Sequence, residues 1–210
     1  MHLLHTLDLA ILRQINLAWA NPFFDRLMPI VSDPNFFRWP ILIAAVLFLL
    51  FGGFRGRVFV FLILLAVGVG DGVIVEHGKK WVRRARPNEA IAGLRMPSRQ
   101  GLKESQVLPH PGRRSFPSGH TCNNVALAVV ACAVYGLRRA WWLWLWAALM
   151  GYSRVYLAAH YPTDVFFSAL FSAAYTLALL ALARLAWNHW TPRRWRAAHP
   201  DLLPLWGKAA

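Results

Sequence analysis

Long apolar stretches alternate with short polar ones along most of this chain. Five of the apolar stretches, at about 37–54, 58–78, 117–136, 140–160 and 163–187, are long enough to cross a bilayer as helices. Such a crossing takes about 17–25 predominantly apolar residues. The pattern therefore predicts an all-α fold, an integral membrane helical bundle of five spans.

Residues 3–20 have a less regular pattern. The apolar positions that share one face of a helix here are Leu4, Leu7, Ile11 and Ile15. Asp8 interrupts that face, and polar residues occupy the opposite one. We expect an amphipathic helix that lies along the membrane interface. A sixth span over the same residues is the alternative that the pattern leaves open.

Three parts follow from this organisation. We expect an N-terminal interfacial helix and linker over 1–36, a membrane-embedded domain over 37–190 and a polar C-terminal tail over 191–210. The only long internal loop of the predicted bundle covers 87–116 and is rich in Pro, Gly, Arg and Ser. Loops of this length in compact folds are usually functional or disordered.

Composition supports a membrane protein with an anionic partner. The chain is 57% hydrophobic and contains 11 Trp, many of them near the ends of apolar stretches, where Trp anchors helices at the interface. Its net charge of +14 indicates anionic lipid or an anionic substrate, and no nucleic-acid partner is expected. Cys122 and Cys132 lie in one apolar stretch without metal-ligand spacing, so no metal or cofactor is predicted.

A first polar cluster follows the second predicted span, with Lys79 and Arg86 separated by six residues and Pro87 directly after. Fixed ammonium and guanidinium groups stabilise the charge of a phosphate, and Arg matches two of its oxygens. Taken alone, the cluster is explained as well by a juxtamembrane basic patch that binds anionic headgroups. The other basic residues of this stretch are Lys80, Arg83 and Arg84.

A second cluster, Pro117–Ser118–Gly119–His120, opens the third predicted span. The unpaired N–H groups of a helix start bind anions, and Gly119 lets the backbone approach a phosphate closely. Ser115 and Ser118 are candidate caps or phosphate donors, and His120 falls in the first turn. The simpler explanation is an ordinary capped helix start with an interfacial His.

The third cluster has Ser153–Arg154, then His160 six residues after Arg154, then Asp164. Pro162 predicts a helix break with His160 at the junction and Asp164 in the next first turn. A carboxylate there can accept a hydrogen bond from Nδ1–H of His160, which leaves Nε2 unprotonated and nucleophilic. The alternative is an acid at a helix N-terminus with an interfacial His nearby.

Topology brings the three clusters together. Threading five spans places residues 79–116 and His160 on one membrane face, while the short basic turns at 55–57 and 137–139 lie on the other. Asp71, inside the second predicted span among several glycines, is expected to have a structural role rather than a catalytic one.

In this order the clusters are similar to the three-part signature of the type 2 phosphatidic acid phosphatase family, K-x6-R-P, P-S-G-H and S-R-x5-H-x3-D. The match is complete from Lys79 to Asp164. The resemblance implies a metal-independent phosphatase that acts through a phosphohistidine, with His160 as nucleophile, Asp164 holding it and His120 as the acid for the leaving group. The residues implied in phosphate binding are Lys79, Arg86, Ser118, Gly119 and Arg154.

Soluble vanadium-dependent haloperoxidases share this signature, but five apolar spans favour the membrane branch. We therefore expect hydrolysis of a phosphomonoester or diphosphate of a membrane lipid. Undecaprenyl-diphosphate and phosphatidylglycerophosphate phosphatases are similar in size and architecture, and a polyprenyl diphosphate is the favoured substrate. Two alternatives stay open: a lipid-to-lipid phosphotransferase that uses the same residues, and a non-enzymatic protein that binds anionic lipid.

Location follows from two opposed signals. A count of Lys and Arg on each face favours a cytoplasmic site, by the positive-inside rule. Several of those cations are expected to bind phosphate, however, so the short basic turns on the opposite face are the clearer signal. With the resemblance, they favour a multi-pass protein of the bacterial inner membrane whose site faces the extracytoplasmic side.

Overall fold

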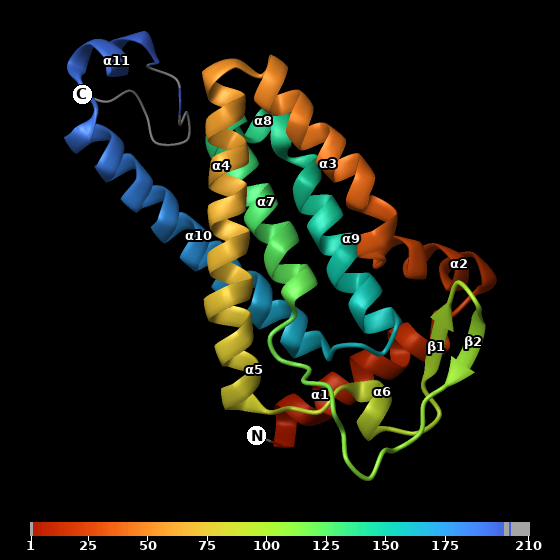
Figure 1. Ribbon diagram of the computed structural model, residues 1–210. Coiled ribbons are helices and arrows are strands. Elements are labelled where there is room, and N and C mark those ends of the chain that lie inside the picture. Colours follow the sequence, from red (N-terminus) through yellow and green to blue (C-terminus); the bar gives the residue numbers. More distant parts are fainter. Residues whose placement is uncertain (1, 200–201, 203–210) are drawn as a thin grey trace.

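The computed structural model describes residues 2–199 and 202, and most of them are helical (Figure 1). The elements in chain order are α1 His2–Arg13, the π-helical η1 Gln14–Ala18, α2 Pro22–Val31, α3 Pro34–Phe51, α4 Gly53–Val69, the π-helical η2 Gly70–Val75, α5 Glu76–Val82, α6 Pro87–Ala90, β1 Arg95–Ser98, β2 Gly101–Glu104, α7 Gly119–Tyr135, α8 Leu137–Ala140, α9 Trp142–Tyr156, α10 Pro162–Trp190 and α11 Arg193–Ala198.

The helix α7 forms the centre of the bundle. It lies against α4, α9 and α10, and Ala, Val and Cys make up most of its buried positions (Figure 1). Small side chains let neighbouring helices approach closely, as is usual for helix contacts in membranes. Leu62 of α4, Val130 of α7 and Leu180 of α10 meet in the main apolar cluster. This packing holds the start of α7 next to the ends of its neighbours.

Of the helices in the described part of the chain, three are long and apolar enough to cross a membrane. They are Pro34–Phe51, the continuous helix Gly53–Val82 and Pro162–Trp190. These three support a membrane protein. The other two expected spans correspond to α7 and α9, with 17 and 15 residues, so the count of five spans stays a prediction.

The helix expected over residues 3–20 is present as α1 and η1. It lies across the lower end of the bundle in Figure 1. Leu4, Leu7 and Ile11 of the predicted apolar face are exposed, as a helix in the interface requires. Asp8, which interrupted that face in the sequence, points inward and is only 2% exposed. Asn16 is fully buried as well.

Residues 87–116, expected as one loop, contain α6 and an antiparallel hairpin of β1 and β2. The hairpin register pairs Arg95 with Glu104 and Ser98 with Gly101. Asn16 bonds to both backbone groups of Arg95, at 2.9 Å to its N–H and 2.8 Å to its carbonyl oxygen. The Arg95 side chain also pairs with Asp25 of α2. The N-terminal elements therefore fix the hairpin beside the bundle.

The expected polar tail over 191–210 follows α10, and its boundary stays a prediction. Thr191 ends that helix, and α11 follows with the basic residues Arg193, Arg194 and Arg196. Residues 200–201 and 203–210 of the predicted tail lie outside the described residues.

Candidate active site

The first cluster is joined to the segment that leads into the second. Arg83 has left-handed backbone angles and ends α5. The chain then runs antiparallel to residues 114–115, with an isolated bridge between Ala85 and Arg114. The Ser115 N–H donates to the Arg84 carbonyl at 2.7 Å. Arg86 Nε donates to the Arg114 carbonyl at 3.3 Å, and Arg86 lines the same cavity as Gly119 at the start of α7.

The second cluster starts α7 as the sequence predicts. Ser118 is the N-cap, and its hydroxyl oxygen accepts a hydrogen bond from the Thr121 hydroxyl at 3.0 Å. Its own N–H donates to the Ser168 hydroxyl at 2.7 Å. Gly78 permits the approach of α5 to this turn, because a Cβ there would stand 2.7 Å from the Pro117 Cδ. Lys79, the next residue, lines the same cavity as Gly119 and His120.

The third cluster occupies the turn between α9 and α10. The N–H groups of Ala159 and His160 donate to the Arg154 carbonyl at 3.0 and 3.2 Å, which folds the turn back over the end of α9. Ala158 takes left-handed backbone angles to make this reversal. His160 is 2% exposed as a residue, yet it lines the cavity together with His120.

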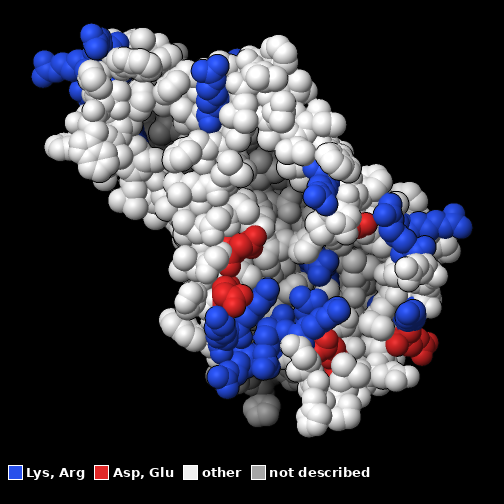
Figure 2. All heavy atoms as spheres, in the orientation of Figure 1, with Lys and Arg blue, Asp and Glu red and all other residues white. Residues whose placement is uncertain are grey.

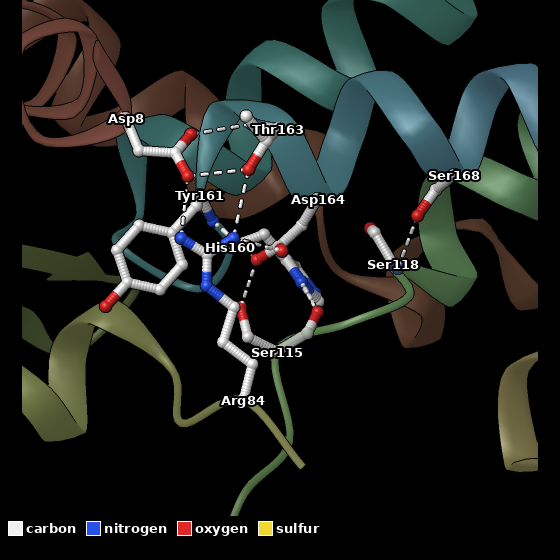
Figure 3. A network of polar contacts seen from close by, with 9 residues as sticks. All are labelled: Asp8, Arg84, Ser115, Ser118, His160, Tyr161, Thr163, Asp164 and Ser168. Carbon is white, nitrogen blue, oxygen red and sulfur yellow. Dashed lines mark hydrogen bonds and ion pairs between the residues drawn. The ribbon is translucent and has the colours of Figure 1, made fainter. Parts of the chain in front are cut away.

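The predicted hydrogen bond between His160 and Asp164 is wrong. Nδ1 of His160 bonds to the backbone carbonyl of Ser115, from the loop that leads into α7 (Figure 3). A carbonyl oxygen only accepts, so Nδ1 carries the proton and Nε2 of the neutral ring is unprotonated. The expected tautomer is therefore reached through a different partner. The sequence could not give this contact, because it depends on how the loop before Pro117 folds.

Asp164 is connected to the same ring through Ser115. Its Oδ2 accepts hydrogen bonds from the Ser115 hydroxyl and from the Tyr161 N–H, the latter at 2.9 Å (Figure 3). Its Oδ1 accepts from Arg84 Nη1 at 2.7 Å. The carboxylate is 1% exposed and all three of its partners are donors. Asp164 thus holds Ser115, whose carbonyl in turn orients His160.

A cavity of about 850 Å³ contains most of the predicted site residues. One part is polar and basic, and it is lined by Lys79, Arg86, Gly119, His120 and His160. Another part is apolar, and it is lined by Phe37, Ile41, Leu127, Trp142, Leu143 and Trp146. Figure 2 shows Lys and Arg side chains gathered at the lower end of the molecule, below a groove whose visible surface is mainly uncharged. The cavity therefore offers a charged headgroup and an apolar chain separate surfaces.

Cations and carboxylates both line this cavity, since Lys79 and Arg86 share it with Asp33, Asp71 and Glu76. Burial and the charge of Arg113 lower the pKa of Arg86, although Glu89 opposes this, and an Arg side chain stays charged at neutral pH. The Nε of Arg154 is buried and has no hydrogen-bond partner among the described residues. An unpaired N–H group of this kind is unusual, because buried N–H groups nearly always have a partner.

The structure separates the predicted phosphate-binding residues into two sets. Lys79, Arg86 and Gly119 line the cavity, whereas Ser118 and Arg154 are not among its lining residues in the described part of the chain. Ser118 is engaged as a helix cap, and its role in phosphate binding stays a prediction.

Asp71, for which the sequence favoured a structural role, lies at the cavity. Its Oδ2 accepts a hydrogen bond from Asn123 Nδ2 at 2.9 Å, and both residues line the cavity. Asp71 lies in the π-helical η2, and π-helical turns inside helices occur frequently at functional sites. A carboxylate within an apolar span is a functional candidate from sequence alone, and its place at the cavity agrees with that signal.

Comparisons with known proteins point to one family. The family model described as PAP2 superfamily matches residues 56–188. The matched region begins in α4, ends in α10 and contains all three clusters.

Two curated proteins and one solved structure are similar to this chain. A lipid A 4'-phosphatase of Bacteroides thetaiotaomicron is 28% identical over 163 residues, which cover 71% of this chain and 65% of that protein. The undecaprenyl-diphosphatase BcrC of Bacillus subtilis is 38% identical over 60 residues, 28% of this chain and 30% of that protein. The chain thus spans less than two thirds of the length of either relative. The crystal structure of Aquifex aeolicus LpxE has a TM-score of 0.65 at 26% identity, over 83% of this chain and 95% of that one.

Proposed function

Since the chain belongs to the PAP2 superfamily, we propose that it is a membrane lipid phosphatase. The proposed reaction hydrolyses a phosphate ester of a membrane lipid through a phosphohistidine on His160. The observation that carries the proposal is the cavity, where His160 and His120 lie beside fixed cations at one part and an apolar surface forms another. A phosphotransferase would need a second lipid acceptor in the same cavity, and no specific observation favours it.

The chemistry divides into two steps. Nε2 of His160 forms a bond to phosphorus while the bond from phosphorus to the lipid oxygen breaks, and protonated His120 donates its proton to that oxygen. Water then forms a bond to phosphorus, the N–P bond breaks, and His120 takes the proton of the water. His160 regains its electron pair, and the products are a lipid alcohol and inorganic phosphate. The proposed phosphate ligands are Lys79, Arg86, Ser118, Gly119 and Arg154.

Within this class we favour a glycolipid phosphate as substrate, in place of the polyprenyl diphosphate that the sequence favoured. The acceptor oxygens of Asp71 and Asn123 support this choice. Asp71 Oδ1 lies close to the proposed phosphate-binding turn, at 3.4 Å from the position that a Cβ on Gly119 would occupy. Asn123 Oδ1 is buried and has no hydrogen-bond partner among the described residues. Sugar hydroxyls and amides would donate to these oxygens, whereas the charge of Asp71 would repel a second phosphate.

A panel of lipid phosphates tests activity and substrate together. Purified protein in detergent should release phosphate in excess EDTA, because Lys79, Arg86 and Arg154 supply the positive charge for the transition state. The panel holds a glucosamine-disaccharide lipid phosphate, undecaprenyl diphosphate, phosphatidylglycerophosphate and phosphatidic acid. We expect the highest kcat/KM with the glycolipid. Release that stops on chelation contradicts the metal-independent mechanism, and a preference for the diphosphate contradicts the role given to Asp71 and Asn123.

We further propose five spans, with α7 and α9 as the inner pair and α1 in the interface. The domain boundaries at 37 and 190 are kept on this basis, in a protein of the bacterial inner membrane. The site then faces the extracytoplasmic side. The apolar side chains exposed on α1 and α3 support contact with lipid, and the turns with Arg55, Arg57, Arg138 and Arg139 favour the cytoplasm for the opposite face.

Thiol labelling of whole cells tests this orientation. Gln100→Cys, in the exposed hairpin turn, should react with a reagent that cannot cross the cytoplasmic membrane. Arg139→Cys, exposed at the other end of the bundle, should react only after the cells are opened. The native Cys122 and Cys132 are buried and give the background. The reverse pattern of labelling would place the site in the cytoplasm.

A further inference from the structure

A buried carboxylate in the N-terminal helix contacts the start of α10. Asp8 Oδ1 accepts a hydrogen bond from the Thr163 N–H at 2.8 Å, and Oδ2 accepts from the Thr163 hydroxyl at 2.6 Å (Figure 3). Thr163 is in the first turn of α10, where N–H groups have no partner in their own helix. Asp8 therefore caps α10 from a helix more than 150 residues away in sequence.

Arg84 connects Asp8 to the proposed catalytic residues. Its Nη2 donates to Asp8 Oδ2 at 2.6 Å, and its Nη1 donates to Asp164 Oδ1 at 2.7 Å (Figure 3). The guanidinium carbon lies 3.7 Å from the ring centroid of Tyr161. Two carboxylates and one aromatic ring thus surround a single guanidinium group, whose planar fork suits this arrangement.

These contacts distinguish Arg84 from the cations that line the cavity. Burial lowers the pKa of Arg84, but the hydrogen bond and charge of Asp8 and the charge of Asp164 raise it more. Arg84 is not among the cavity-lining residues of the described chain, unlike Lys79 and Arg86. Its charge is already matched by two anions, so it has little to offer a phosphate.

The contacts continue from Arg84 to the reacting ring in three links. Arg84 holds Oδ1 of Asp164, Oδ2 of Asp164 holds the Ser115 hydroxyl, and the Ser115 carbonyl accepts from Nδ1 of His160. Asp8 fixes the first member of this series and the helix that carries Asp164. Contacts of this outer kind orient reactive groups without touching the substrate.

We propose that Arg84 and Asp8 are positioning residues for His160, acting through Asp164 and Ser115. The N-terminal helix then belongs to the active site as well as to the membrane interface. The inference rests on the proposed function, since it assigns a role in the same reaction.

The test compares the same substitution at two adjacent residues. Arg84→Lys replaces a fork by a single ammonium group, which cannot reach both carboxylates in the same geometry. We expect kcat for the best lipid of the panel, radiolabelled and in detergent, to fall about 10- to 100-fold with little change in KM. Arg83→Lys is the matched control, because the Arg83 side chain donates to the Lys80 carbonyl and, within the described part of the chain, forms no ion pair with Asp8 or Asp164. That variant should keep the kcat of the unaltered protein.

Repeating the substitution in the Asp164→Asn protein separates a positioning role of Arg84 from a general loss of structure. If Arg84 acts through Asp164, Arg84→Lys should cause little further loss of kcat in protein that already carries Asp164→Asn. Asp8→Asn is a milder change and replaces Arg84→Lys in the test if that variant fails to fold. It should also lower kcat less in the Asp164→Asn protein than in the unaltered one. An equal fold-loss in both backgrounds, or a rise in KM at constant kcat, would overturn the inference. No phosphate release by the unaltered protein from any lipid of the panel would instead overturn the proposed function.

Discussion

His160→Ala is expected to abolish phosphate release, with kcat lower by at least about 10³-fold. The reason is that the substitution removes the proposed nucleophile, Nε2 of His160, while the proposed phosphate-binding cations remain. Ring removal in a buried turn also leaves space, so folding is checked by thermal unfolding in the same detergent. The measurement is release of radiolabelled phosphate from the best lipid of the panel.

The same experiment follows the covalent intermediate. Rapid acid-free quenching of the unaltered protein should leave labelled phosphate on the chain, and His160→Ala should leave none. His189→Ala is the matched control, because His189 is exposed near the far end of α10 and should retain both label and activity. Label that persists on the His160→Ala chain would show that another residue is the nucleophile.

His160→Ala also decides between an enzyme and a protein that only binds lipid. The variant keeps Lys79, Arg86 and Arg154, so it should still bind vesicles that contain anionic lipid. A binding protein would lose nothing of its function by this change. An enzyme would keep the binding and lose the turnover, and the two outcomes can be read from one preparation.

The sequence predicted the parts of the site that depend on helix ends. Apolar stretches set where the helices run, and polar clusters at their ends must then meet on one face, as Lys79, His120 and His160 do in the cavity. Pro162 marks the start of the helix that carries Asp164, because proline is favoured at the first helical position. These features are local, so a sequence pattern is enough to reveal them.

The parts that were missed depend on contacts between distant segments. The partner of His160 Nδ1 is a backbone carbonyl 45 residues away, and no side-chain pattern marks a carbonyl. Arg84 was grouped with its basic neighbours, because nothing in the sequence links it to Asp8, 76 residues earlier. Asp8 did give one signal, since a carboxylate that interrupts an apolar helix face needs a partner inside the protein.

Asp164→Asn is expected to lower kcat by about 10²- to 10⁴-fold with KM nearly unchanged. All three partners of the carboxylate donate: the Ser115 hydroxyl, the Tyr161 N–H and Arg84 Nη1. An amide must therefore turn its NH2 group towards a donor in either orientation. The Ser115 carbonyl would lose its fixed place, and with it the orientation of the His160 ring.

Ser115→Ala tests whether Asp164 acts on His160 through Ser115 or directly through its negative charge, because Asp164 keeps its charge in this variant. The substitution removes the hydroxyl that Asp164 holds but keeps the backbone carbonyl that accepts from His160. We expect a smaller loss, about 10-fold in kcat, since the carbonyl is then only less firmly placed. Asp25→Asn is the control for loss of an ion pair elsewhere, as Asp25 pairs with Arg95 near the hairpin. It should lower the unfolding temperature and leave kcat within a few-fold. A near-normal kcat for Asp164→Asn would mean that Ser115 holds the ring without help, and the roles inferred for Arg84 and Asp8 would then fail with it.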